Sequence, residues 1–378
     1  MEASLEELRE SFEDFSAQVT DHRVNRNKLH SVEEILFLTL TAIISGAEGW
    51  RDIERFGKAK IDFLRQVFPF KNGIPSDDTI RRFFRALDPK VFQACFVSWV
   101  KTLVLPGDSH VAIDGKVSRS TFDGDQNPLH MVSAFASESR LVLAQEKVLD
   151  KSNEITAIPN LLNLLDLEGG VVTIDAMGCQ REIAGTIGEK GADYVLSLKG
   201  NQGTLHTDVR LVFEDEVLLK ELRLDNYHSI DGSEHGRLEE RCYRAVACPQ
   251  VLKDHHNWPY LTSLVEVRSR REIKGEVSQE NRYYITSLKP VAEKIGKTIR
   301  AHWAIENSLH WILDISFRDD DSRIRRGNAP ENITIIKHMA LNMLQKAKGK
   351  RDSIKQMRKA AGWDNTQLLR ILAQISSI

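Results

Sequence analysis

Two short runs of β-branched residues, each ending in an aspartate, constrain the fold most strongly. They are HVAID at residues 110–114 and VVTID at residues 171–175. The other predicted elements of this region are a hairpin, two apolar helices and a last strand, at residues 130–137 with 141–148, 155–165 with 180–190, and 192–199. Strands interrupted by helices in this order predict a mixed sheet with helices packed on it, which is an α/β layer.

The segments on either side of this region have different sequence patterns. The first hundred residues predict helices, one of which begins with a capping box of Ser31 and Glu34. We expect a helical N-terminal domain at residues 1–106, which is either a DNA-binding module or a helical cap on the next domain, and a second domain at residues 107–378.

A β-rich insertion is expected inside the second domain, at about residues 203–289. Its predicted strands are residues 237–247, 260–268 and 281–287. The helical pattern returns after the insertion and ends in a basic helical tail.

The composition is that of an ordinary globular protein, with 41% hydrophobic and 28% charged residues, which excludes a disordered or fibrous chain. Lys and Arg number 52 against 54 Asp and Glu, and this net charge of -2 is not typical of a nucleic-acid binder. The distribution is uneven, because residues 323–370 hold twelve Lys and Arg against three Asp and Glu. This stretch is either a solvated helical face or a surface that contacts phosphates.

Several sequence signals are absent. The four cysteines show no C-x-x-C spacing, the N-terminus has no signal-peptide pattern, and no apolar stretch is long enough to span a bilayer. We therefore expect reduced thiols, a cytoplasmic location and no membrane partner. Neither a GxxxxGK[ST] loop nor a GxGxxG turn follows a strand, so we expect no nucleotide cofactor.

The aspartates at the two strand ends are candidates for a metal site. A carboxylate at the end of a buried strand is costly unless it is paired, hydrogen-bonded or bound to a cation. A single such residue usually caps a turn or helix, but Asp114 and Asp175 end two strands that the topology can place side by side. Lys116 follows Asp114 by two residues, so strand alternation directs it toward the same pocket.

A third carboxylate comes from the predicted helix IRAHWAIENSLHWILD. Its polar residues recur every four positions and share one stripe: His302, Glu306, His310 and Asp314. The apolar residues beside this stripe, Trp303, Leu309 and Leu313, are expected to dock the helix against the sheet. Glu306 then joins the two aspartates in an all-oxygen site suited to Mg²⁺ or Mn²⁺, and two such ions can support phosphoryl transfer.

Two other metal sites are alternatives. A zinc site formed by His302, Glu306 and His310 needs a fourth ligand, and the His-Glu-x-x-His order of metallopeptidases is absent. The acidic run at residues 319–321 lacks the glycine and the distal Glu of a calcium loop. We interpret that run as a capped, solvated turn.

A polar, glycine-containing loop follows the last strand of the sheet. In it, Gly200 and Gly203 let the backbone approach a ligand closely. Lys199, Asn201 and Gln202 supply donors for phosphates or base edges. Turns of this kind end many strands, but beside the carboxylates this loop is a candidate to face DNA.

Long motifs in a fixed order cover nearly the whole chain. They are VEEILFLTLTAIISGAEGWRDIERFG near the N-terminus, then HVAIDGK, KSNEITAIPNLLNLLD, VVTIDAMGCQ, LKGNQG, HGRLEER and HWAIENSLHWILDISFRDDDSRIRRGNAPEN. Together they resemble the bacterial insertion-sequence DDE transposases of the H-repeat-associated (ISAs-type) family, and the first motif resembles that family's associated N-terminal domain.

The resemblance implies a ribonuclease-H-like catalytic core in which Asp114, Asp175 and Glu306 form a DDE triad that binds two Mg²⁺ or Mn²⁺ ions. It implies DNA strand cleavage and transfer at insertion-sequence ends, with DNA as the partner at element ends and target, and a homodimer in the DNA complex. The residues expected to contact DNA are Lys116, Lys199, Asn201, Gln202, Arg237, Arg300, Arg325 and Arg326.

The pattern around Glu306 departs from that of wider relatives, which carry Tyr-x2-Arg-x3-Glu-x6-Lys. In this chain Ile299, His302 and Leu313 stand at the Tyr, Arg and Lys positions. The candidates to hold the terminal phosphate instead are Arg300, His310 and the basic run Arg323, Arg325 and Arg326. His302, Asn307 and His310 are expected to support the catalytic Glu.

Two alternative functions use the same fold. One is a transposase-derived DNA-binding protein that is no longer mobile, and the other is a metal-dependent nuclease that does not join strands. Absence of Mg²⁺ or Mn²⁺ binding would favour the DNA-binding protein over the transposase. Only a product assay distinguishes the nuclease from the transposase, because both use the same carboxylates.

Overall fold

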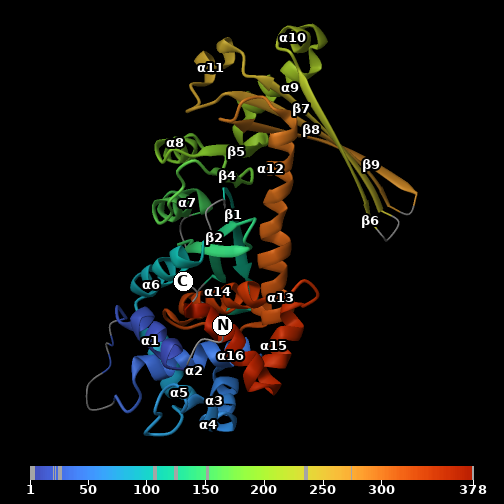
Figure 1. Ribbon diagram of the computed structural model, residues 1–378. Helices are drawn as coiled ribbons and strands as arrows, with labels where there is room; N and C mark the ends of the chain where they lie inside the picture. Colours follow the sequence, from blue (N-terminus) through green and yellow to red (C-terminus); the bar gives the residue numbers. More distant parts are fainter. Residues whose placement is uncertain are drawn as a thin grey trace.

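The computed structural model describes residues 5–19, 21, 23, 28–104, 109–122, 127–149, 153–233, 237–273 and 275–376. Its strands are β1 (His110–Ser118), β2 (Leu129–Ala136), β3 (Leu141–Lys147), β4 (Val171–Ile174), β5 (Asp193–Leu198), β6 (Asp225–Ser233), β7 (Arg237–Ala247), β8 (Ser263–Ile273) and β9 (Glu276–Thr286). They form one nine-stranded sheet in the order β3-β2-β1-β4-β5-β9-β8-β7-β6. Figure 1 shows helix α12 (Ala292–Ile305) beside the core strands in the middle of the molecule.

The first five strands form the core of the sheet. Strand β1 pairs antiparallel with β2 and parallel with β4, and β5 continues the parallel part. Helices α7 (Glu154–Asn163) and α8 (Arg181–Glu189) pack on this core, and α12 contacts β1, β4 and β5. This arrangement confirms the predicted α/β fold class, a ribonuclease-H-like mixed sheet with flanking helices.

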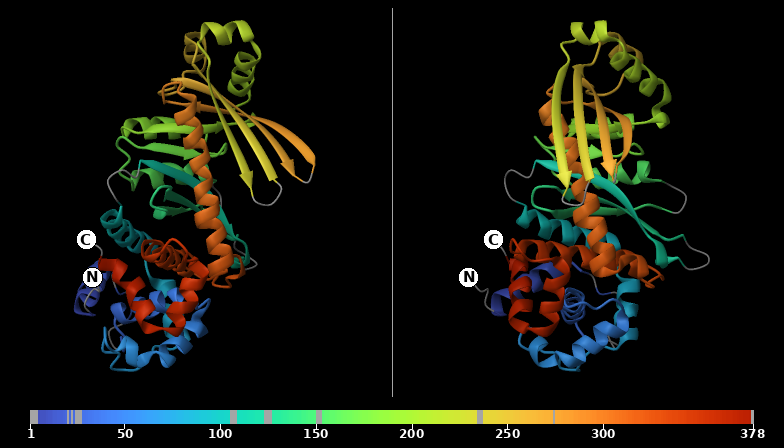
Figure 2. Two further views of the ribbon diagram at one scale, coloured as in Figure 1. Left: turned by 45° about the vertical axis from the view of Figure 1, so that its right-hand side comes forward. Right: turned by 90° about the vertical axis from the view of Figure 1, so that its right-hand side faces the viewer.

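The insertion extends the core sheet. Strand β9 pairs antiparallel with β5, and β8, β7 and β6 follow in antiparallel order. These strands project as a long arm beside α12 (Figure 2). The insertion also contains α9 (Gly203–Glu214), α10 (Glu216–Glu221) and α11 (Gln250–His256), which the sequence interpretation did not include, and β6 was missed as well.

Helices from both ends of the sequence pack together at the other end of the molecule. They are α1 (Leu5–Ser16), α2 (Val32–Ile44), α3 (Trp50–Ala59), α4 (Ile61–Leu64), α5 (Asp77–Ala86), α6 (Pro89–Leu103), α14 (Ala329–Ala347), α15 (Ile354–Trp363) and α16 (Asn365–Leu372). Helix α14 contacts α2, α5, α6 and β3, so one hydrophobic core joins these helices to the sheet (Figure 1). The division into domains at residues 106 and 107 stays a prediction.

Local signals in the sequence set the start of α2. Ser31 accepts a hydrogen bond from the Glu34 amide, and the Glu34 side chain accepts one from the Ser31 amide, so the predicted capping box is confirmed. The helix that follows is buried along almost its entire length. Among the described helices, none combines the length and the apolar character that crossing a membrane requires.

The core around α14 contains a histidine whose burial predicts acid sensitivity. His338 is 1% exposed, its ring nitrogens have no hydrogen-bond partner in the described part of the chain, and burial lowers its pKa to about 3. The unfolded chain takes up this proton near pH 6.5, so the folded state loses stability as the pH falls from about 6.5 toward 3. Urea unfolding of wild type and His338→Leu should show a stability difference that moves in favour of the variant by up to about 1.4 kcal/mol per pH unit between pH 6 and pH 4. A difference that does not change with pH contradicts a neutral buried His338.

Candidate active site

The three acids predicted from sequence line one cavity of about 290 Å³. Asp114 lies within β1, Asp175 directly follows β4, and Glu306 follows α12. The neighbouring parallel strands β1 and β4 and the helix packed on them therefore bring together carboxylates that are almost two hundred residues apart in sequence. The lining of the cavity also includes Thr173, Lys199, Arg282, Tyr284, His302 and Trp303.

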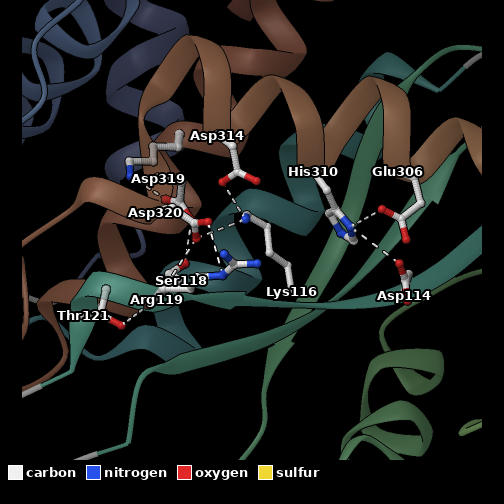
Figure 3. A network of polar contacts seen from close by, with 11 residues as sticks. Asp114, Lys116, Ser118, Arg119, Thr121, Glu306, His310, Asp314, Asp319 and Asp320 are labelled. Carbon is white, nitrogen blue, oxygen red and sulfur yellow. Dashed lines mark hydrogen bonds and ion pairs between the residues drawn. The ribbon is translucent and has the colours of Figure 1, made fainter.

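Asp114 and Glu306 form the more tightly coupled part of this group. Burial, together with the neighbouring Glu306 carboxyl, raises the pKa of Asp114 to about 8. His310 Nδ1 lies 3.5 Å from Asp114 Oδ2 and 3.6 Å from Glu306 Oε2. Figure 3 shows the His310 ring next to both carboxyl groups. One ligand atom from each of these three residues lies within 4.8 Å of the others. The charge of Glu306 disfavours ionisation of Asp114, and a bound cation would favour the ionised form of both side chains.

Asp175 is held by its own loop. Its Oδ1 accepts hydrogen bonds from the backbone amides of Met177 at 3.0 Å and Gly178 at 3.3 Å. Burial nevertheless raises the pKa of Asp175, because desolvation outweighs these two hydrogen bonds. The carboxylate is therefore oriented by the backbone but lacks full compensation for its charge.

The predicted DNA-facing loop supports Asp175 from the other side. Asn201 Nδ2 donates to Ala176 O at 2.6 Å, and Gln202 Nε2 donates to Cys179 O at 2.9 Å. These amides thus hold the backbone of the segment that follows Asp175. Whether they also contact DNA, as predicted from sequence, stays a prediction.

A wide helical turn keeps the polar stripe facing the sheet. Residues Glu306–His310 form a π-helical turn between α12 and α13 (Trp311–Phe317), and the Trp311 amide donates to Glu306 O. In a regular α-helix, residues every four positions drift by about 40° per step, or about 120° from His302 to Asp314. One extra residue in the π turn takes back about 100° of this drift. His302, His310 and Asp314 can therefore all reach the sheet, where they contact Thr173, Asp114 and Lys116.

His302 is part of a buried hydrogen-bond chain. Thr173 Oγ1 lies 2.8 Å from His302 Nδ1 and 3.0 Å from His110 Nε2. Burial lowers the pKa of His302 to about 4, so this residue is neutral at physiological pH. It occupies the position of the Arg found in wider relatives but cannot supply the same positive charge.

The zinc alternative required His302, Glu306 and His310 to converge. Among the described residues, the group that converges instead contains Asp114 together with Glu306 and His310, while His302 turns to Thr173. The converging group contains two carboxylates and one imidazole, and Asp175 adds a third carboxylate to the lining of the same cavity. Oxygen donors therefore predominate, which favours a hard divalent cation over zinc.

Lys116 lies beside His310, below the α13 residue Asp314, in a charged network (Figure 3). Its Nζ is 2.6 Å from Asp314 Oδ1 and 3.6 Å from Asp320 Oδ1, and its side chain is only 11% exposed. The network continues through Asp319, which is 3% exposed and pairs with Lys337 at 2.5 Å. The interpretation of residues 319–321 as a solvated turn is therefore wrong for Asp319.

The two roles of Lys116 can be separated experimentally. In Lys116→Gln, the loss of the Asp314 pair should lower the free energy of unfolding by about 1–3 kcal/mol. The dependence of DNA affinity on salt should stay unchanged, because the ammonium already has two carboxylate partners. As a control, Lys199→Gln removes an exposed cation that lines the cavity, and it should reduce the slope of log affinity against log salt by about 0.9. A similar slope change in Lys116→Gln would instead support a phosphate contact.

The other predicted DNA contacts lie outside this cavity. Arg300 is near Asp231, at 3.5 Å, and Arg325 Nε donates to Ser120 O at 2.9 Å. Arg326 is exposed, and Asn307 donates to Trp303 O at 3.1 Å. Arg237 begins β7, and its side chain lies outside the described part of the chain.

Sequence reasoning missed several residues at the cavity. Arg282 and Tyr284 come from β9, whose place beside β5 could not be read from a local pattern. Trp303 was expected to dock the helix on the sheet, but this was wrong, because Trp303 is 43% exposed at the cavity. Leu309 and Leu313 are buried in the hydrophobic core, and their docking on the sheet itself stays a prediction.

Comparison with known protein families identifies the family of the chain. A family model described as the transposase DDE domain matches residues 105–343, and one described as DDE_Tnp_1-associated matches residues 13–100. The chain belongs to the DDE transposases.

Its relatives show to which family of DDE transposases the chain belongs. The chain is 41% identical over 377 residues to "H repeat-associated putative transposase YhhI" of Escherichia coli (strain K12), covering 97% of this chain and 98% of the relative. It is also 41% identical to "Putative transposase YncI" of Escherichia coli O157:H7, covering 98% of this chain and 96% of that protein. It is thus a DDE transposase of the H-repeat-associated family, an enzyme of DNA transposition that cleaves and transfers DNA strands, as predicted from the sequence motifs.

A solved structure of piggyBac transposase in a synaptic complex with hairpin DNA is similar to the chain. The alignment has a TM-score of 0.46 and 10% sequence identity, and it covers 99% of this chain and 82% of the other.

Proposed function

We propose that Asp114, Asp175 and Glu306 together hold two Mg²⁺ or Mn²⁺ ions and that this site cleaves and joins DNA at insertion-sequence ends. The observation that carries the proposal is the convergence of three carboxylates on one cavity. Two of them, Asp114 and Asp175, have raised pKa values, chiefly because of burial. Carboxylates in this condition are suited to a divalent cation.

Each acid has a distinct structural support in this proposal. Asp114 is held by the central strand β1, and Asp175 is oriented by the amides of Met177 and Gly178. His310 contacts both Asp114 and Glu306 and so positions the two carboxylates relative to one another. When bound, the ions supply charge neutralisation at the phosphate and activation of the attacking oxygen.

The exposed side of the cavity supplies groups for DNA. Lys199 offers a positive charge, and the exposed Trp303 offers a ring on which a base can stack. Arg282, which pairs with Glu280, lies beside them. We propose that these residues hold the DNA end, while the more distant Arg300, Arg325 and Arg326 contact flanking DNA in a homodimeric complex. The cytoplasmic location predicted from the sequence belongs to the same proposal.

The decisive experiment uses purified protein and labelled duplexes that carry the DNA ends flanking the coding region. Cleavage and joining should require Mg²⁺ or Mn²⁺ and stop in EDTA. Equal cleavage with and without divalent ions would overturn the metal proposal. The product also separates the alternatives, because a nuclease leaves only cut ends, and a protein that is no longer mobile binds the duplex without cutting it.

A further inference from the structure

A second group of metal-ligating side chains lies between α9 and α11, in the insertion. It consists of Asp208 on α9 and His255 and His256 in the last turn of α11. One ligand atom from each residue lies within 4.8 Å of the others. Figure 1 places both helices at the end of the molecule opposite the N-terminal helices, beyond β5.

We propose that Asp208, His255 and His256 bind one Zn²⁺ ion that clamps α9 to α11. Two imidazole nitrogens and one carboxylate oxygen suit Zn²⁺ and similar borderline ions, and a water molecule completes a tetrahedral site. The carboxylate-rich set of Asp114, Asp175 and Glu306 suits harder ions instead. The chain thus presents two donor sets with different metal preferences.

The geometry of the group requires only a small adjustment. Ligand atoms about 2.0–2.1 Å from a tetrahedral ion are about 3.3–3.4 Å apart. His256 Nε2 and Asp208 Oδ2 are 2.8 Å apart, so these atoms need to separate by about half an ångström for an ion of this size. His256 is buried and fixed, whereas His255 is exposed and Asp208 is partly exposed, so the last two can move.

The two histidines already face one another at the helix end. Consecutive residues of an α-helix point about 100° apart, which normally separates their side chains. Here the imidazole rings of His255 and His256 are 4.7 Å apart between centroids, in an edge-to-face arrangement. Asn257, with a φ of 44°, ends α11 immediately after them. One nitrogen of each ring nevertheless lies within 4.8 Å of a carboxylate oxygen of Asp208 on α9.

The clamp would stabilise the segment that supports Asp175. Helix α9 begins at Gly203, next to Gln202, whose amide donates to Cys179 O in the segment after Asp175. An ion that fixes α9 against α11 should therefore raise the unfolding temperature of the protein, because it binds only the folded state.

The test measures Zn²⁺ binding to full-length, tag-free protein by equilibrium dialysis and mass spectrometry. Wild type should bind Zn²⁺ at the insertion. His255→Gln and Asp208→Asn should each weaken this binding by more than about 100-fold, since the loss of an outer-shell partner alone costs about 10–100-fold. Asp114→Asn is the matched control, because it removes a donor of the acidic cavity and should leave the binding unchanged. Zn²⁺ should also raise the melting temperature of wild type but not of His255→Gln.

Two results would overturn the proposal. In one, wild type and His255→Gln bind Zn²⁺ equally, and Asp208 and His256 then form only a hydrogen bond between the helices. In the other, binding is lost in Asp114→Asn, which assigns the ion to the acidic cavity. Both results leave the Mg²⁺ proposal for DNA cleavage untouched, because strand cleavage is measured separately.

Discussion

Asp175→Asn should abolish strand cleavage while leaving the fold intact. The Asn side-chain oxygen can still accept the hydrogen bonds that Met177 and Gly178 donate to Asp175, so the loop keeps its conformation. Only the negative charge is lost, and a metal-binding carboxylate becomes a neutral amide. We expect cleavage of a labelled DNA end to fall by at least about 10³-fold, since even one hydrogen-bond donor at an active site contributes about 10²–10³.

Stability separates this effect from misfolding. Because burial raises the pKa of Asp175, the charged form is disfavoured in the folded protein, and the melting temperature of Asp175→Asn should equal or slightly exceed that of wild type. Asp364→Asn is a matched control: this exposed residue caps α16 through the Thr366 amide, which Asn can also do. Its cleavage rate should match that of wild type. If Asp175→Asn cleaves DNA at the wild-type rate, Asp175 is not a catalytic residue.

Of the variants proposed here, Asp319→Ala should lower the free energy of unfolding the most. Burial by itself would raise the pKa of Asp319, but Lys337 and Ser118 hold it below its usual value. Lys337 is 5% exposed and pairs with Asp319 at 2.5 Å, and the Ser118 hydroxyl donates to the same carboxylate at 2.5 Å. Removal of Asp319 leaves the Lys337 ammonium buried without this partner, so we expect the free energy of unfolding to fall by about 3–5 kcal/mol.

Two further variants test the cause of that loss. Asp319→Leu combined with Lys337→Met removes both charges and should recover most of the stability in urea unfolding. Glu293→Ala breaks the exposed pair with Lys297 on α12 and should cost less than about 1 kcal/mol. If Asp319→Ala lowers the free energy of unfolding no more than Glu293→Ala does, the buried pair does not stabilise the fold.

Local patterns in the sequence were sufficient for the elements of the core sheet and for the candidate acids, but not for β6 and the helices of the insertion. The β-branched runs before Asp114 and Asp175 form neighbouring parallel strands, and the four-residue spacing around Glu306 lies on a helix that faces them. These features depend on residues close together in the chain, because alternation and helical periodicity record which side chains share a face. Family motifs then linked the three acids, whose catalytic roles remain to be tested by the variants above.

Partners across the molecule were decided only by the tertiary structure. No local pattern distinguishes the buried Asp319 from the neighbouring acids of the same run, or shows that Trp303 remains exposed. The same holds for Asn201 and Gln202, whose amides bind the backbone after Asp175. The sequence alone determined which side chains share the face of a regular strand or helix, but it did not predict the π-helical turn that keeps the stripe around Glu306 on one side. Which faces meet was decided by the packing of elements that can lie more than three hundred residues apart in the sequence, because burial and pairing are properties of both surfaces in a contact.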